Sequence, residues 1–446
     1  MFKRIMKGAM IGAAALALSV PAQAADITVN LFGASAQYKF WTSAAPEFLA
    51  SVCNGDVYHA KTTGMVGTDG ERDTGIAYST DCQGVGDNVT ITYTTFSSQK
   101  GILAVSDQAG YDNCGTGKAE VADPSNVSAT VYPAAAGTVD GLVCADIHIG
   151  ASDVSGEAFG QESHGQLLGP NGGGWYDSYA NPVDTTGLEN CRPINVPFSF
   201  FAHQDTVVLD GLDLADETVH TYWGEFYPWW PVGDSKQNLT RLMATSLFSG
   251  QVLDWSDFGY PAQEVILCLR HAGSGTHATL DADIMRGEAN LVKDEVLNTD
   301  DGYILGISPV TYFNKGSSDM MNCIRDAGAG AVGYADSDKN GGNPDGSAGS
   351  YTTVQRLKYM GKDAVAYTLI HGMYDFWSAQ WLYFRADEDA SIKAKINELC
   401  AFASDYLNMP SSRRAFWTTK GEMRVEKSSD FTWPSWKDPS LWTHPE

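Results

Sequence analysis

The order of apolar and polar positions repeats along the chain. Four short runs are apolar or alternate with polar residues, as β-strands do, and they cover residues 27–32, 89–93, 144–149 and 265–269. Each run is followed by a turn of small residues and then by a stretch with helical spacing of apolar side chains. Strands that alternate with helices predict an α/β fold built around parallel sheets.

The turns after these four strands are rich in Gly, Ser and Thr. The second turn contains Ser97 and Ser98, and the third is Gly150-Ala151-Ser152-Asp153. The carboxyl ends of parallel strands lie at one edge of a sheet, where ligands of open α/β proteins bind. The pattern therefore indicates a binding site assembled from several turns.

The fourth turn is chemically the most specific. Arg270 supplies a fixed positive charge, and Ser274, Gly275 and Thr276 precede a helix expected at 278–286. Free N–H groups at a helix start favour an anion, and the arginine adds a bidentate charged contact. The alternative is that Arg270 pairs with a surface carboxylate while the glycines only turn the chain.

These motifs resemble those of the periplasmic phosphate-binding proteins of ABC transporters, and they occur in that family's order. The matching segments are 150–153, 247–255, 270–276 and 332–334. The resemblance implies an α/β, two-lobed periplasmic binding protein fold with crossing hinge strands. Stretches at 54–88, 106–142 and 160–190 would be loop insertions that enlarge it. It also implies a function: a solute-binding protein, not an enzyme, that delivers inorganic phosphate to a membrane ABC permease.

The same resemblance assigns roles to individual residues. Arg270, Ser274, Gly275 and Thr276 would hold phosphate oxygens, and Ser97 or Ser98 would supply a hydroxyl and an amide. Asp153 would accept the proton that phosphate carries and sulfate lacks, because a buried polar site rejects ligands that leave its groups unpaired. The simpler interpretation of Asp153 is that it caps the following helix.

The first turn departs from the family pattern. Gln37 and Tyr38 stand where the family usually has threonine and phenylalanine. Because glutamine is a longer polar side chain, the ligand could instead be another oxyanion or a phosphorylated organic molecule, with the aromatic segment 223–230 as an added wall of the site. A further alternative is an extracellular scaffold that binds no ligand. A phosphatase in the same cleft would need an activated nucleophile or a metal pair, and the sequence has no motif for either.

Together with the pattern of the family that the chain resembles, two apolar stretches predict where the chain crosses between lobes, 193–201 and 374–384. Lobe one would comprise 25–192 and 372–446, and lobe two 193–371. Two crossings permit hinge closure over a ligand.

The N-terminus has the pattern of a secretory signal peptide. Lys3, Arg4 and Lys7 precede an apolar run, and small residues end it at position 24. No cysteine follows to carry a lipid anchor, and no later run approaches the ~20 apolar residues that span a bilayer. We expect residues 1–24 to be removed and the protein to be a periplasmic or secreted monomer.

Eight cysteines lie beyond residue 24, an even number that suggests disulfides in an exported chain. We expect the pairs that keep each bridge within one predicted lobe, namely Cys53–Cys82, Cys114–Cys144, Cys191–Cys400 and Cys268–Cys323. No zinc motif is present, and a calcium-loop start at Asp336 and Asp338 has Ser347 at the position that needs an acid. No cofactor or metal is therefore expected.

The net charge of -25, which becomes -28 without the three cations of the leader, argues against nucleic acid or an anionic membrane as partner. It does not exclude an anionic ligand, because salt screens surface charge beyond about 8–10 Å. His271 and His277 flank the arginine turn. They are either solvated loop residues or groups that tune anion affinity with pH.

Overall fold

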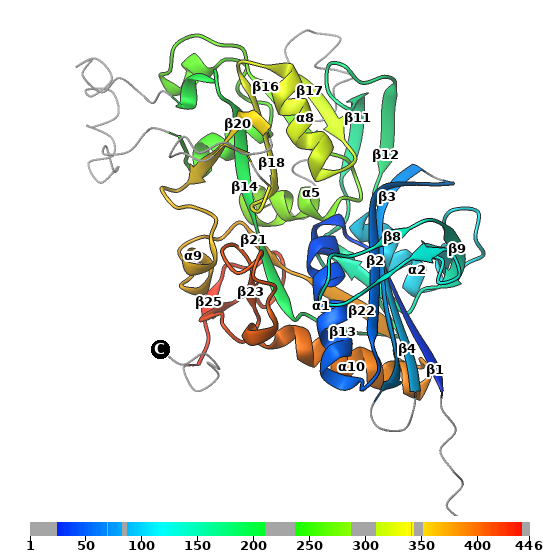
Figure 1. Ribbon diagram of the computed structural model, residues 1–446. Coiled ribbons are helices and arrows are strands. Elements are labelled where there is room, and N and C mark those ends of the chain that lie inside the picture. Colours follow the sequence, from blue (N-terminus) through cyan, green and yellow to red (C-terminus); the bar gives the residue numbers. More distant parts are fainter. Residues whose placement is uncertain are drawn as a thin grey trace, which may run out of the picture.

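The computed structural model describes residues 25–68, 70–82, 87–209, 237–286, 309–339, 341–342 and 351–438. The signal peptide expected at 1–24 and the aromatic segment 223–230 lie outside these ranges. Two large mixed sheets, each with helices packed against it, form the body of the molecule (Figure 1). The expected two-lobed α/β fold is confirmed.

The first sheet has eight strands, and its centre consists of β10, β1 and β4, which run parallel. In spatial order the strands are β13 (Leu188–Cys191), β22 (Trp381–Arg385), β10 (Ile149–Ser152), β1 (Asp26–Gly33), β4 (Asp87–Thr95), β3 (Gly70–Cys82), β2 (Val57–Gly67) and β7 (Thr130–Val131). The helices packed on it are α1 (Tyr38–Val52), α2 (Ser98–Val105) and α10 (Ala390–Ser404).

The second sheet also has a parallel centre, made by β11, β17, β16 and β18. Its main path is β12 (Trp175–Tyr179), β11 (Glu162–Leu167), β17 (Val310–Asn314), β16 (Ile266–Arg270), β18 (Ala331–Asp336), β14 (Ile194–His203), β20 (Tyr351–Tyr359) and β15 (Asn238–Leu239). Three short strands join off this path, β19 (Gly341–Gly342), β21 (Trp377–Ala379) and β23 (Thr418–Thr419). Its helices are α4 (Arg241–Phe248), α5 (Gly275–Thr279) and α8 (Ser317–Ala327).

Small elements complete the described part of the chain. They are the strand pairs β5 (Lys118–Ala122) with β9 (Leu142–Asp146), β6 (Val127–Ser128) with β8 (Thr138–Val139) and β24 (Val425–Glu426) with β25 (Ser435–Trp436), and the helix α9 (Ala366–Ile370).

The helix α1 shows why the sequence pattern predicts its elements well. The spacing of Phe40, Trp41, Phe48 and Leu49 places these side chains on one face of a helix, and all four are buried. Burying an apolar side chain of this size contributes roughly 1.5–3 kcal/mol. The amphipathic pattern therefore fixes which face of α1 packs on the first sheet.

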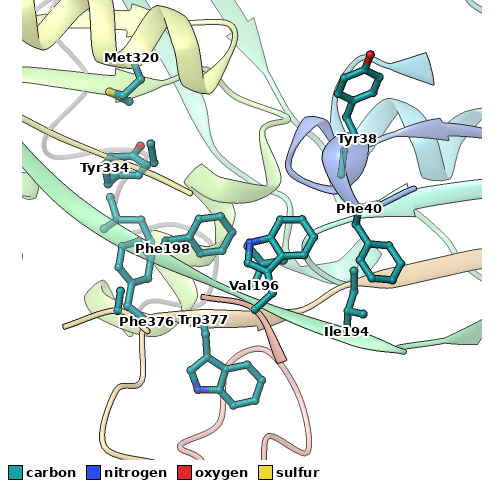
Figure 2. Packing of buried hydrophobic residues seen from close by; sticks show 14 of the residues in the cluster. Tyr38, Phe40, Ile194, Val196, Phe198, Met320, Tyr334, Phe376 and Trp377 are labelled. Carbon is teal, nitrogen blue, oxygen red and sulfur yellow. The ribbon is translucent and has the colours of Figure 1, made fainter. Parts of the chain in front are cut away.

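The chain passes between the sheets at β14 and β22, as expected, and also between β10 and β11 and between β12 and β13. β14 belongs to the second sheet and pairs with β21, while β22, which begins two residues after β21 ends, pairs with β10 and β13 of the first sheet. Figure 2 shows Ile194, Val196 and Phe198 of β14 between Phe40 on one side and Tyr334 on the other. The expected crossing strands are thus present, and they run through a shared apolar core.

Two stretches expected to be loops form hairpins instead. Residues 57–82 make β2 and β3, which pair with each other and extend the first sheet through β4. Glycines and threonines weaken the apolar alternation there, so packing against the neighbouring strand decides the structure. The hairpin of β11 and β12 within 160–190 pairs with β17 of the second sheet, although it precedes residue 193. The lobe boundaries given above stay a prediction.

All four expected disulfides are present, Cys53–Cys82, Cys114–Cys144, Cys191–Cys400 and Cys268–Cys323. None of the helices in the described ranges has the length and apolar character that crossing a bilayer requires.

Candidate functional site

The carboxyl ends of the two sheets' parallel strands meet at one cluster of side chains. Ser98 and Asp153 follow β4 and β10 of the first sheet, while Arg270 ends β16 and Thr276 lies in the first turn of α5. The Thr276 hydroxyl donates to the Asp153 carboxylate at 3.5 Å, and the Asp153 N–H donates to Ser98 Oγ at 3.2 Å. Three of the four turns that the sequence indicated therefore come together.

Gly275 allows this close approach. A Cβ atom at its position would lie 2.3 Å from Ser98 Oγ and 2.6 Å from the Asp153 Cβ, closer than real carbon atoms come. Glycine is thus required because backbone of one sheet's turn packs directly on side chains of the other.

Arg270 is the cation of the cluster and is 2% exposed. One terminal nitrogen donates to Ser317 Oγ at 3.0 Å and Thr276 Oγ1 at 3.3 Å, and the other donates to the Lys315 carbonyl at 2.9 Å. Its Nε is buried and has no hydrogen-bond partner among the described residues. Pairing with a surface carboxylate is therefore wrong for Arg270, since the guanidinium is held inside the protein by neutral groups.

Asp153 directly follows β10, which comprises Ile149–Ser152 and not the residues 144–149 expected from the sequence. Residues 142–146 instead form β9, which pairs with β5, because the chain turns before it enters the sheet. The segment after Asp153 is a three-residue 3-10 helix at Gly156–Ala158 capped from Ser155, so Asp153 caps no helix. Its Oδ1 is buried without a partner in the described part of the chain.

The electrostatics of Asp153 are unusual. Burial and the nearby negative charge of Asp336 raise the pKa of this carboxyl to about 7, against the opposing effect of Arg270. Near neutral pH the group therefore exchanges its proton readily. Such a carboxyl can accept a hydrogen bond when ionised and donate one when protonated.

The predicted serine ligands hold the backbone of the turns. Ser97 caps α2 by accepting the Lys100 N–H, and Ser274 caps α5 by accepting the His277 N–H, both at 3.4 Å. The helix expected at 278–286 begins earlier, at Gly275, and α5 continues directly as the π-helix Leu280–Met285. The placement of Ser274–Thr276 at a helix start is thereby confirmed.

Gln37 and Tyr38 make no hydrogen bond with Arg270 in the described part of the chain, and both have partners near the first sheet. Gln37 donates to the Ser152 carbonyl at 3.2 Å and accepts from Trp41 Nε1 at 2.9 Å. The Tyr38 hydroxyl lies 3.2 Å from the Thr74 carbonyl, and burial raises its pKa. Both side chains therefore connect the first turn to strands of the first sheet, Gln37 to β10 and Tyr38 to β3.

The two histidines beside the turn are buried, so the solvated-loop interpretation is wrong. Burial and the charge of Arg270 lower the pKa of His271 and of His277 to about 3, which keeps both rings neutral at ordinary pH. Nδ1 of His277 contacts the Tyr334 hydroxyl, which accepts the Arg270 N–H at 3.1 Å. This chain of contacts orients the end of β16.

Ser317 and Asp336 also belong to the cluster, although the sequence motifs do not include Ser317 and include Asp336 only as the start of a calcium loop. Ser317 begins α8 directly after β17, which is a fifth strand-turn-helix junction, and its hydroxyl donates to Asp336 Oδ1 at 3.3 Å. Asp338, the other residue of the supposed calcium loop, forms ion pairs with Lys39 and Arg413. Among the described residues, no group of three or more metal-ligating side chains comes together.

Comparisons with known proteins give a likeness of overall structure. No family model and no curated protein matches the chain. An ABC-type phosphate transport receptor from Vibrio cholerae matches with a TM-score of 0.40 and 12% identity, over 83% of this chain and 93% of that one. A putative phosphate ABC transporter substrate-binding protein with bound phosphate from Clostridium perfringens gives 0.42 and 11%, over 83% and 92%. A phosphate-binding protein from Stenotrophomonas maltophilia gives 0.40 and 11%, over 84% and 83%. At such values the function has to be argued from the site itself.

Proposed function

We propose that this protein is an extracytoplasmic solute-binding protein that captures inorganic phosphate between its two sheets and presents it to a membrane ABC permease. One observation carries the proposal: Arg270 and Asp153, on turns of different sheets, are both buried, and each keeps one polar atom without a partner among the described residues. Buried charged groups are normally paired, so a ligand that contacts both explains their burial.

Phosphate fits the charges of this cluster. Its oxygens accept hydrogen bonds from the Arg270 guanidinium and from the hydroxyls of Ser98 and Thr276. One proton lies between a phosphate oxygen and Asp153, whichever of the two carries it, so the carboxyl does not repel the ligand. Sulfate has no proton at neutral pH and would face the ionised carboxylate.

The permease and the location rest on other observations. The leader-like residues 1–24 and four disulfides suit an exported protein in an oxidising compartment. A binding protein that closes on its ligand needs two bodies joined by few strands, and β14 and β21 provide such a connection.

Calorimetric titration tests the proposal directly. The purified protein is unfolded and refolded to remove bound ligand and is then titrated with phosphate and, separately, with sulfate. Tight one-to-one binding of phosphate without a sulfate response at pH 8 is expected. Silence to both anions would contradict phosphate capture, and turnover of a chromogenic phosphate ester would contradict a purely binding role.

A further inference from the structure

A second pocket lies beside the crossing strands and is separate from the Arg270 cluster. It is partly open to solvent, and it extends from Asn195 on β14 and Trp377 on β21 to the C-terminal strand pair. Figure 2 shows the Trp377 ring pointing away from Val196 of the crossing strand.

Positive charge gathers around this pocket in a strongly acidic chain. Arg192, Lys420 and Lys437 line it, and Arg192 contacts the Trp381 ring at 4.5 Å but has no ion pair among the described residues. Lys437 donates to a backbone carbonyl at 2.7 Å, and the nearby charge of Glu426 acts on it. In the described part of the chain, Arg192 and Lys420 are therefore the cations available to an anion.

The other charged groups of the pocket are largely engaged. Lys427 pairs with Asp283 at 2.6 Å, and Asp430 accepts the Ser155 N–H at 2.6 Å. Burial raises the pKa of the Asp430 carboxyl. Glu426 is the remaining acid of the lining. Positive charge therefore exceeds negative charge in the pocket.

Two further features describe what the pocket would take. The indole N–H of Trp377 is buried and has no partner in the described ranges, so a hydrogen-bond donor is left over at the lining. Met423 and Val425 make the rest of the wall apolar. A ligand with an anionic head and an apolar body would complement this lining.

We propose that this pocket is a second binding site, for a small organic carboxylate. The carboxylate accepts hydrogen bonds from Arg192, Lys420 and the Trp377 N–H, and the apolar part lies against Met423 and Val425. The proposal is independent of what Arg270 binds.

Calorimetric titration of the purified protein with benzoate tests the site. Saturable one-to-one binding in the millimolar range or tighter is expected, with acetate and benzyl alcohol each binding at least about tenfold more weakly because each lacks one half of the probe. Binding that is absent at about 50 mM benzoate, or equal for all three probes, overturns the proposal.

Variants locate the binding. Arg192→Gln with Lys420→Gln is expected to weaken benzoate binding at least about tenfold, while Lys393→Gln, a lysine paired with Glu189, leaves it unchanged. If the double variant does not fold, Lys420→Gln alone, an exposed position, and Trp377→Phe, which removes the N–H, replace it. Loss of benzoate binding in Arg270→Ala, or displacement by saturating phosphate, would assign the probe to the other site and overturn the proposal.

Discussion

The Thr276 hydroxyl donates to the carboxylate of Asp153 at 3.5 Å, and this contact joins turns that follow strands of two different sheets. The distance is at the long limit of a hydrogen bond, so the contact itself adds little stability. The contact is informative because it forms only where the two turns lie against each other. Changes on either side of it should therefore affect ligand capture before they affect folding.

Gly275→Ala should keep all the ligand-contacting side chains but push apart the turns that carry them. The added Cβ would lie 2.3 Å from Ser98 Oγ, so the two sheets cannot approach as closely. We expect phosphate affinity to fall by at least about a hundredfold, in line with overpacking costs of 1–3 kcal/mol or more. The control is Gly115→Ala, whose Cβ meets no atom within 4 Å. Equal affinities of the two variants in calorimetry would show that close approach is not needed.

Arg270→Ala removes the buried cation. Because the ligand charge would then be desolvated without a partner, phosphate binding should weaken by roughly 3–5 kcal/mol. Arg325→Ala removes an arginine that pairs with Asp326 at the surface, and it should bind phosphate normally. A loss smaller than about tenfold would exclude Arg270 from direct contact with the anion.

Asp153 should make anion selectivity depend on pH. Sulfate needs a protonated Asp153, whose pKa is about 7, so its affinity in the unmodified protein should fall about tenfold per pH unit above pH 7. Asp153→Asn is neutral at every pH, and its sulfate affinity should be flat from pH 6 to pH 9. Titrations with both anions over this range measure the effect, and equal selectivity in both proteins at pH 8.5 would contradict it.

Ionisation of the Asp153 carboxyl should lower the free energy of unfolding as pH rises. An unfolded aspartate ionises near pH 3.9, while folded Asp153 ionises near pH 7, so between these values the folded state binds more protons. The free energy of unfolding therefore falls across this window, and the loss is complete above pH 7. Ligand-free Asp153→Asn should match the unmodified protein near pH 4 and be more stable at pH 8.

Denaturant unfolding at several pH values measures this difference in stability. The control is Asp146→Asn, because the Asp146 side chain is mostly exposed and pairs with Lys118 at the surface. A stability gain of Asp153→Asn that stays constant between pH 4 and pH 8 would argue against a raised pKa.

Ser317→Ala should weaken binding modestly. The hydroxyl accepts from Arg270 at 3.0 Å, and losing one such bond to a charged group costs about 1.5–3 kcal/mol when its partner stays buried. Part of this cost lowers the free energy of unfolding and only the rest weakens binding, so we expect phosphate affinity to drop about three- to tenfold. Ser318→Ala, which removes a hydroxyl that accepts from Lys339 at the surface, is the neighbouring control. A rise in affinity would mean that Ser317 holds Arg270 away from the ligand.

The sequence predicts the parts of the site that depend on local order along the chain. Apolar strand, small-residue turn and helix follow one another at β4 with α2 and at β16 with α5, so the positions of Ser98, Arg270 and Thr276 follow from pattern. Glycine and serine at these turns also suit backbone approach and helix capping. The family resemblance added the pairing of these turns across the two sheets.

What the sequence missed depends on tertiary contact. Asp336 sits at the end of β18 beyond the recognised motif, and only the neighbouring strand brings it to Ser317. Gln37 carries a polar side chain in a turn that suits a ligand, but its side chain donates to the carbonyl of Ser152, 115 residues later in the sequence. The local spacing of apolar residues predicts neither contact, because each joins residues that are far apart in the sequence.

The order of the cysteines has a consequence for how the protein matures. Three bridges join cysteines that follow one another in the order of the chain's cysteines. Cys191 instead pairs with Cys400, which lies 209 residues later, and Cys268 and Cys323 are synthesised between the two. An oxidant acting on the chain as it emerges from its N-terminus would meet Cys191 and Cys268 as the next free pair. Correct maturation therefore calls for either delayed oxidation or a disulfide isomerase, and a cell that lacks isomerase activity should accumulate the mispaired form.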